Sequence, residues 1–113
     1  MNMVAMIGNV ATDPVVEHTP SGKAICTFRL AVSRPGGEQA DFFTVAAFDR
    51  QGEVCAAYLQ TGRRIGVEGR LHHSSFETAD GESRSRVEIV ASRVQFLGAN
   101  SARAAAEFGE VSA

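Results

Sequence analysis

Short apolar segments, separated by glycine, proline and aspartate, are the feature of this sequence that most constrains its fold. The runs Asp13-Pro14, Pro20-Ser21-Gly22 and Pro35-Gly36-Gly37 have the chemistry of turns and interrupt the chain between apolar segments. Most of the segments alternate apolar and polar residues, as half-buried β-strands do, whereas only one has helical spacing. The sequence therefore predicts a mostly β protein with one short helix.

Five strands and one helix can be placed along the chain. The first strand covers Met3 to Val10, and Val15 to Thr19 continues in extended conformation after the turn. The helix is expected between Asp49 and Leu59, and Gly62 is placed to end it in a left-handed turn. The other strands are expected at Lys23 to Val32, Asp41 to Phe48, Arg63 to Phe76, and Arg84 to Val90 with a continuation to Leu97.

Three strands, a helix and two more strands form the element order of a five-stranded Greek-key OB-fold barrel. A chain of 113 residues, 44% of them hydrophobic, fits one compact domain with a single core. We place that domain at residues 1–98. Residues 99–113 are expected to be a short flexible extension, in which the alanine-rich segment Ser101 to Phe108 would be only a marginal helix.

The pleat of the strands predicts which aromatic rings face solvent. In the third strand Phe43 and Val45 can face the core only if Phe42 and Phe48 face outward, because side chains alternate between the two faces. The same alternation in the fourth strand turns Ile65, Val67, Gly69 and Leu71 inward and Arg70, His72, Ser74 and Phe76 outward. In the fifth strand it turns Val87 and Ile89 inward and Arg84, Arg86 and Glu88 outward.

Exposed phenylalanines interleaved with arginines are typical of a surface that binds single-stranded nucleic acid. Every nucleobase has a π-face that can stack on an aromatic ring, and cationic side chains hold the phosphates. We therefore interpret Phe42, Phe48 and Phe76 as base-stacking residues. For any one of them, the alternative is a subunit contact or a misplaced core residue.

The charge balance restricts where such a surface can lie. The chain carries 11 basic and 13 acidic residues, a net charge of −2, so no global field attracts nucleic acid. All basic residues except Lys23 are arginines, which can stack on bases and bind phosphates through two hydrogen bonds. An alternative for each arginine is a solvated, salt-bridged surface beside acidic neighbours such as Asp49, Glu82 and Glu88. The predicted phosphate contacts are Arg34, Arg50, Arg70, Arg84 and Arg86.

The sequence favours binding over catalysis. Cys26 and Cys55 lie in apolar runs, as buried thiols do, and no segment has the length or flanks of a membrane span or a signal peptide. His72 and His73 are neighbours in a strand and point to opposite faces, which disfavours a metal site. No catalytic triad or phosphate-binding glycine loop can be placed. We expect a cytoplasmic protein without cofactor, metal or enzymatic activity, and without a membrane partner.

Short motifs appear in one order over about residues 2–98, and together they resemble the bacterial single-stranded DNA-binding proteins. The resemblance implies an OB-fold that binds single-stranded DNA without sequence preference, and protects it during replication, recombination and repair. It also implies base stacking at the positions of Phe42, Phe48 and Phe76. The motifs are Met6-Ile7-Gly8-Asn9-Val10, Asp13-Pro14, Ser21-Gly22, Phe28-Arg29-Leu30-Ala31-Val32, Asp41-Phe42, Ala57-Tyr58-Leu59, Val67-Glu68-Gly69-Arg70-Leu71, Asp80-Gly81 and Val94-Gln95-Phe96-Leu97.

Self-association is expected as well. An open barrel leaves strand edges, and the apolar strand Met3 to Val10 could pair with a copy of itself about a two-fold axis. The resemblance extends this expectation to a homotetramer associated with the nucleoid. Monomers and dimers remain alternatives at this point.

The sequence departs from the family in three respects. Met3, Glu17, His72, Ser74 and Ser75 replace residues that are often basic, and the loop after Val32 is shorter and lacks an aromatic residue. The chain stops at Ala113 without the acidic peptide through which most cellular members recruit replication proteins, so we do not expect that recruitment. Either a paralogue or phage-type protein, or a shortened chain, would account for this end.

Two other functions stay open at this stage. A primosomal replication protein, a tailless relative that acts mainly through protein contacts, would share the fold. An OB-fold interaction module that has lost DNA binding would share it too, and the reduced basic surface would support that reading. The aromatic triad favours the DNA-binding function.

Overall fold

A computed structural model describes residues 1–97 together with the strand at 111–112. Strands precede and follow a single helix in this part of the chain, in the order predicted. The elements are β1 (Val4–Val10), β2 (Val15–His18), β3 (Ala24–Ser33), β4 (Ala40–Phe48), α1 (Asp49–Tyr58), β5 (Arg64–Glu77), β6 (Ser83–Phe96) and β7 (Val111–Ser112).

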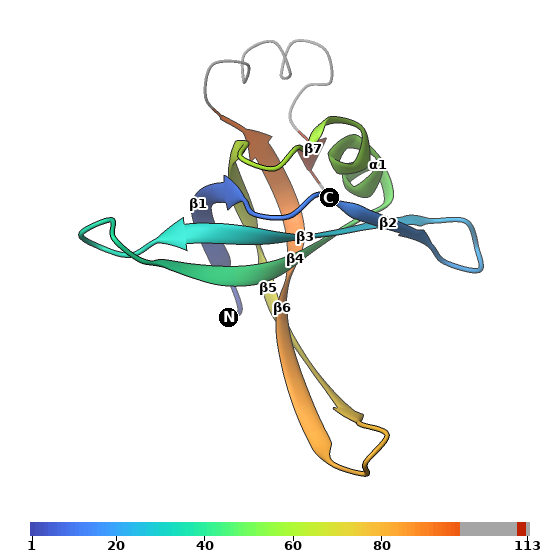
Figure 1. The fold of residues 1–113 in the computed structure, drawn as a ribbon. Coiled ribbons are helices and arrows are strands. Elements are labelled where there is room, and N and C mark those ends of the chain that lie inside the picture. Colours follow the sequence, from blue (N-terminus) through green and yellow to red (C-terminus); the bar gives the residue numbers. More distant parts are fainter. Residues whose placement is uncertain (98–110, 113) are drawn as a thin grey trace.

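Five of the strands close into a barrel, so the predicted OB-fold is confirmed (Figure 1). The strands neighbour one another in the order β1-β5-β6-β4-β3, and an additional β1–β3 pairing closes the ring. All contacts around the ring are antiparallel except β4–β6, which is parallel. Strand β2 extends the sheet at β3 and β7 pairs with β6. The extended segment after the first turn is thus a strand of its own, and it pairs with β3.

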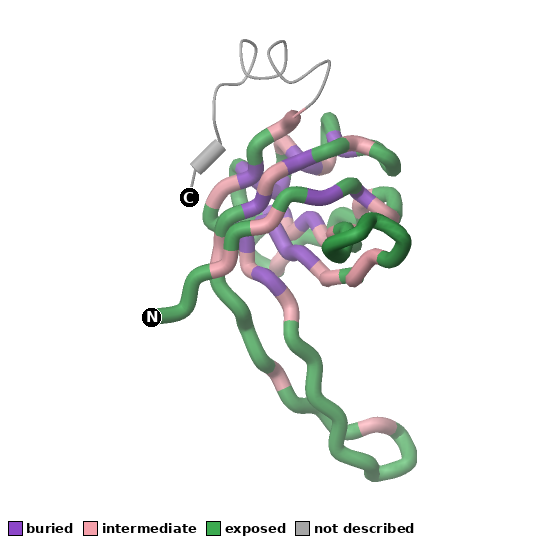
Figure 2. Tube along the Cα trace, turned by 90° about the vertical axis from the view of Figure 1, so that its left-hand side faces the viewer, coloured by how far each residue is buried: buried purple, intermediate pink, exposed green. Residues whose placement is uncertain are grey.

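The core fills the inside of this barrel. Figure 2 shows the buried residues gathered in the barrel, whereas the long hairpin that leaves it is almost entirely exposed. Phe28 and Leu30 from β3, Ile65 and Val67 from β5, and Ile89 from β6 are 0–1% exposed. Side chains that alternate inward along each strand therefore build the core, as their sequence pattern predicts.

Two local features let the barrel close. Strand β1 crosses β3 at Gly8, where a Cβ atom would collide with the carbonyl group of Ala31. Strand β6 contains an extra residue, Ser92, because Arg93 pairs with Glu68 but Ala91 pairs with Gly69. The Ser92 carbonyl oxygen accepts a hydrogen bond of 2.8 Å from the amide nitrogen of Gln51, a side chain 3% exposed in α1. The first turn of the helix is thereby attached to the bulge in β6.

The helix ends before the glycine that we expected to terminate it. Its last residue is Tyr58, and the Leu59 amide donates to the Cys55 carbonyl oxygen. Gly62 has a φ of 91°, but it lies in the turn that follows, where the Arg63 amide donates to the Gln60 carbonyl oxygen. The left-handed conformation was predicted correctly, and its place in a β-turn after the helix was not.

The hairpin of β5 and β6 extends beyond the barrel (Figure 1). Its turn is closed by the Thr78 amide, which donates to the Glu82 carbonyl oxygen. Leu71 and Val87 were predicted to face the core, yet they are 43% and 54% exposed. Both residues lie on the inward side of the pleat. They are exposed because the hairpin extends past the barrel there, and no other layer of the described structure covers that side.

Cys26 and Cys55 are free and buried, as the sequence indicates. Burial raises the pKa of Cys26 to about 11 and, together with the nearby Cys26 thiol, that of Cys55 to about 12. The segment predicted as a marginal helix, Ser101 to Phe108, lies outside the described residues. Within the described part, no helix combines the length and apolar character that a membrane span requires.

Candidate nucleic-acid interface

Three adjacent strands place the three predicted aromatic residues and three of the five predicted arginines on one outer face. Strand pairing fixes this arrangement, because residues directly opposite each other in a sheet share a face. Ala46 of β4 is opposite Val90 of β6, Val90 is opposite Arg70 of β5, and Phe76 is opposite Arg84. We call this surface the stacking face. It comprises Phe42, Thr44, Ala46 and Phe48 of β4, Arg70, His72, Ser74 and Phe76 of β5, and Arg84, Arg86, Glu88 and Val90 of β6.

All three predicted stacking rings are exposed on this face. Phe42 is 54% exposed, Phe48 39% and Phe76 42%. Phe42 and Phe48 lie at the two ends of β4, and Phe76 lies near the tip of the projecting hairpin. Exposed rings of this size carry a cost in water that a stacked base would remove. Their predicted outward orientation is confirmed.

Arginines cover two of the rings. The Arg29 guanidinium lies 5.6 Å from the centre of the Phe42 ring, and that of Arg86 lies 5.4 Å from the centre of the Phe76 ring. Both are cross-strand contacts within the sheet. Arg29 was not among the predicted phosphate contacts. Its outward parity in β3, next to the strand that carries Phe42, is the sequence signal that could have identified it.

The junction of β4 and α1 forms one side of a groove. Asp49, the first helical residue, has a φ of 56°, and this left-handed conformation turns the chain sharply after Phe48. Phe48 and Arg50 line a groove of about 540 Å³ together with Arg70 and His72 of β5. Glu88 and Val90 of β6 also line it. Arg50 and Arg70 thus line the same groove as Phe48.

The remaining predicted arginines differ in how far they are already engaged. Arg34 donates to the same Asp41 oxygen from Nε at 2.9 Å and from Nη2 at 2.7 Å, and its third nitrogen donates to Gln39. The hydrogen bond from Arg34 lowers the pKa of the Asp41 carboxyl below its ordinary value. Arg84 makes a looser pair of 3.4 Å with Glu82, in which both side chains are more than 60% exposed. Arg34 is therefore already paired within its own loop, whereas the Arg84 side chain is only loosely engaged.

The histidines do not gather into a metal site. His72 is opposite Glu88 and His73 is opposite Val87, so the two rings lie on opposite faces of the hairpin. Among the described residues, no group of three or more histidine, cysteine, aspartate or glutamate side chains could hold a metal ion.

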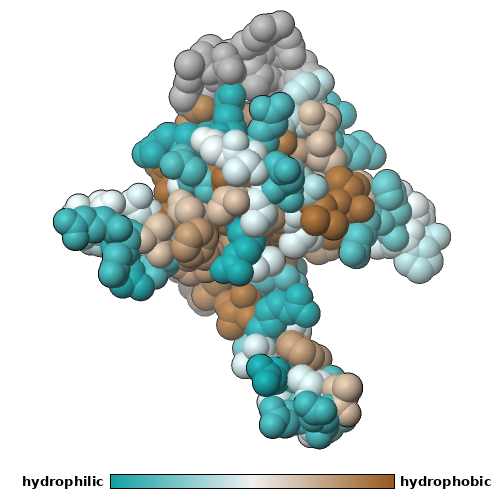
Figure 3. All heavy atoms as spheres, viewed as in Figure 1, coloured by the Kyte–Doolittle hydropathy of each residue, from teal (hydrophilic) through white to brown (hydrophobic). Residues whose placement is uncertain are grey.

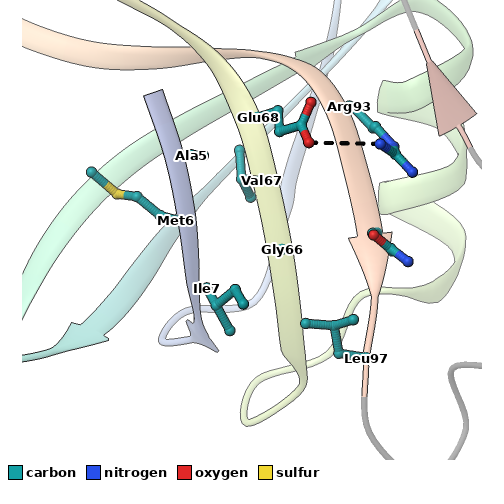
Figure 4. Close-up of a pocket in the computed structure, with 9 residues that line it drawn as sticks. Ala5, Met6, Ile7, Gly66, Val67, Glu68, Arg93 and Leu97 are labelled. Carbon is teal, nitrogen blue, oxygen red and sulfur yellow. Dashed lines mark ion pairs between the residues drawn. The ribbon is translucent and has the colours of Figure 1, made fainter. Parts of the chain in front are cut away.

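A second, more apolar surface lies on β1, β5 and β6. Figure 4 shows a pocket in which Ile7 and Leu97 lie on either side of Gly66, with an ion pair of 3.6 Å between Glu68 and Arg93 beside them. Ile7 is 54% exposed. Strand β1 pairs with β5 along its length but with β3 only at Asn9 and Val10. One edge of β1, from Val4 to Ile7, therefore has no partner strand in the described structure.

Hydropathy distinguishes the barrel from its extensions. On the side drawn in Figure 3, hydrophobic side chains form patches on the barrel, interrupted by hydrophilic ones, whereas the ends of the hairpins are mainly hydrophilic. The surface of the barrel on this side is thus mixed in character.

Comparison with known proteins agrees with this geometry. Residues 1–97 match the model of the single-strand binding protein family. A single-stranded DNA-binding protein of Treponema pallidum is 40% identical over 99% of this chain and 67% of its own length. Proteins of the same name from Clostridium tetani and Oceanobacillus iheyensis are 41% and 37% identical over 86% of this chain. The chain spans 70% and 63% of the lengths of these two proteins. It therefore belongs to the single-strand binding protein family.

Proposed function

We propose that this protein binds single-stranded DNA independently of its sequence and protects it during DNA replication, recombination and repair. The observation that carries the proposal is the stacking face, where Phe42, Phe48 and Phe76 are 39–54% exposed among arginines. Stacking of a base on an aromatic ring contributes on the order of 1–3 kcal/mol. A duplex offers no free base faces, so the same surface discriminates against it.

The arginines have two roles in this proposal. Arg50 and Arg70, beside Phe48, bind the phosphates that follow the stacked base. Arg29 and Arg86 cover Phe42 and Phe76 in the free protein. A base that stacks on the covered side displaces the guanidinium, which then turns to a neighbouring phosphate. Arg84 adds a contact at the hairpin tip, whereas Arg34 stabilises its loop through Asp41.

Self-association completes the proposed binding particle. The open edge of β1 and the apolar surface around Ile7 and Leu97 suit pairing with a second copy about a two-fold axis (Figure 4). Two such dimers would form a homotetramer. Four stacking faces in one particle would raise the effective concentration of each for a strand already bound to another.

The proposed activity requires no catalysis, cofactor or metal. It would take place in the bacterial cytoplasm, at the nucleoid, with single-stranded DNA and copies of the chain as partners. The stacking face favours this function over a protein-protein adaptor, because an adaptor has no need of three exposed rings beside arginines.

The experiment is a fluorescence anisotropy titration of labelled oligothymidine at low and high salt, with a duplex of equal length as control. The DNA carries the label because the chain contains no tryptophan whose fluorescence could report binding. Tight binding to the single strand alone, weakened by salt, is expected. Equal affinity for duplex and single strand would refute the proposal and favour an adaptor.

A further inference from the structure

Gln51 is the one buried polar or charged side chain among the residues that the structure describes. It lies in the first turn of α1 and is 3% exposed. Its amide nitrogen donates to the Ser92 carbonyl oxygen at 2.8 Å, whereas its own oxygen, Oε1, has no hydrogen-bond partner in that part of the chain. An unpaired buried acceptor costs at least as much as one neutral hydrogen bond contributes. An apolar side chain of similar length would avoid this cost, so stability alone does not explain the glutamine.

The hydrogen bond lies where strands β4 and β6 stop pairing. The two strands run parallel, and their last paired residues are Ala46 and Val90. Phe48 and Ser92 follow two residues later in their respective strands, on the same side of this last pair. The Gln51 amide therefore links the segment that carries Phe48 to β6 just beyond the last pair of the two strands.

The junction between β4 and α1 depends on contacts of this kind. Asp49, the residue after Phe48, has a φ of 56°, which is uncommon for a residue with a side chain. No side chain caps the start of the helix. A backbone in such a conformation persists only where neighbouring contacts hold it. Two contacts do so here: the Gln51 hydrogen bond, and close packing at Gly52, where a Cβ atom would lie 2.7 Å from the Ala47 carbonyl oxygen.

We propose that Gln51 is a positioning residue for DNA binding: its hydrogen bond to the Ser92 carbonyl fixes the junction of β4 and α1, and thereby the orientation of the Phe48 ring. Gln51 and Phe48 line the same groove of about 540 Å³. A ring that is held in place before binding loses less conformational freedom when a base stacks on it. The inference rests on the proposed binding of single-stranded DNA and adds a residue that acts through Phe48.

The first experiment measures stability and DNA affinity in Gln51→Met. Methionine keeps the length of the side chain and removes both the bond to Ser92 and the unpaired oxygen. Thermal unfolding should therefore occur at an unchanged or higher temperature. Affinity for a short labelled oligothymidine should nevertheless fall by about fivefold, the lower limit for the loss of one stacked base. A purely structural role predicts the reverse, a lower unfolding temperature with unchanged affinity. Gln51→Leu, which is also apolar, repeats the comparison, and circular dichroism verifies that each variant folds.

A double-mutant cycle then tests whether Gln51 acts through Phe48. In Phe48→Ala protein there is no ring to position, so Gln51→Met should have little further effect on affinity. The matched background is Phe76→Ala, which removes a ring near the tip of the hairpin instead. There Gln51→Met should still reduce affinity by about fivefold. An equal reduction in the two backgrounds would overturn the proposal, whatever the effect on stability.

The two levels of the account fail in different ways. If the wild type binds oligothymidine and Gln51→Met binds it equally well, Gln51 has no positioning role and the proposed function stands. If the wild type does not bind oligothymidine, the proposed function is refuted, and the inference with it.

Discussion

The dependence of DNA affinity on salt can separate arginines that bind phosphates from arginines that stabilise the fold. Each phosphate neutralised on a single strand contributes about 0.7 to the slope of log affinity against log salt concentration. We do not count Arg34 among the expected phosphate contacts, because two of its nitrogens donate to Asp41 at 2.9 and 2.7 Å and the third donates to Gln39. The accessible arginines on or beside the stacking face are Arg29, Arg50, Arg70, Arg84 and Arg86.

If each of these arginines neutralises one phosphate, the wild-type slope has a magnitude of about 3.5 per protomer. Arg70→Ala should reduce it by about 0.7, because Arg70 lies in the groove beside Phe48. Arg34→Ala is the matched control, with the same loss of charge and no expected change in slope. The assay is anisotropy titration of a short labelled oligothymidine over a series of salt concentrations.

Equal slopes for Arg70→Ala and the wild type would refute the assignment of Arg70 to a phosphate. A reduced slope for Arg34→Ala would show that its bonds to Asp41 open when DNA binds, and that the contact geometry of the free protein does not predict phosphate contacts. Both results remain interpretable because the slope, unlike the affinity, is insensitive to a uniform loss of stacking.

Three further predictions concern the fold and its assembly. Gly8→Ala should lower the free energy of unfolding in urea by about 1–3 kcal/mol, because the new methyl group meets the Ala31 carbonyl, and an unchanged value would argue against so close a crossing. Burial raises the pKa values of the Cys26 and Cys55 thiols to about 11 and 12, so the unfolded chain loses the thiol protons at a lower pH than the folded protein does. Stability should therefore fall as pH rises above about 9, by up to about 1.4 kcal/mol per pH unit for each thiol, until about pH 11 for Cys26 and about pH 12 for Cys55. A double alanine variant should lose that part of the decline; an identical pH profile would contradict the assignment. Ile7→Glu should reduce the particle mass measured by light scattering, whereas an unchanged mass would exclude this surface from the assembly.

Strand alternation was sufficient to predict much of the fold and the orientation of the rings. In β4 the core position of Val45 fixes Phe42 and Phe48 on the outer side, because a strand has only two faces. The same rule failed for Leu71 and Val87, which are 43% and 54% exposed. Alternation predicts which face a residue lies on, but it does not show where the opposing layer ends. That boundary depends on how far β5 and β6 extend past the rest of the barrel.

Contacts between side chains could not be predicted from the sequence. Arg34 and Arg70 look equivalent along the chain, yet only Arg34 has a carboxylate within 2.7 Å. The strand register that places Phe42 near Arg29 depends on the whole β3–β4 pairing. The attachment of Gln51 to the Ser92 carbonyl depends on a bulge that carries no glycine or proline signal in β6. Such contacts arise from tertiary structure rather than from local pattern.

The central claim is that bases stack on the stacking face. It is tested most directly by introducing a tryptophan, because the chain contains none. Phe76→Trp places the probe on the stacking face, and Val87→Trp places a matched probe, at a position that is 54% exposed, on the reverse face of the same hairpin. A stacked base quenches indole emission, so saturating oligothymidine should quench Phe76→Trp strongly and Val87→Trp little. Equal quenching in the two variants, or none in Phe76→Trp while the DNA is bound, would contradict the account.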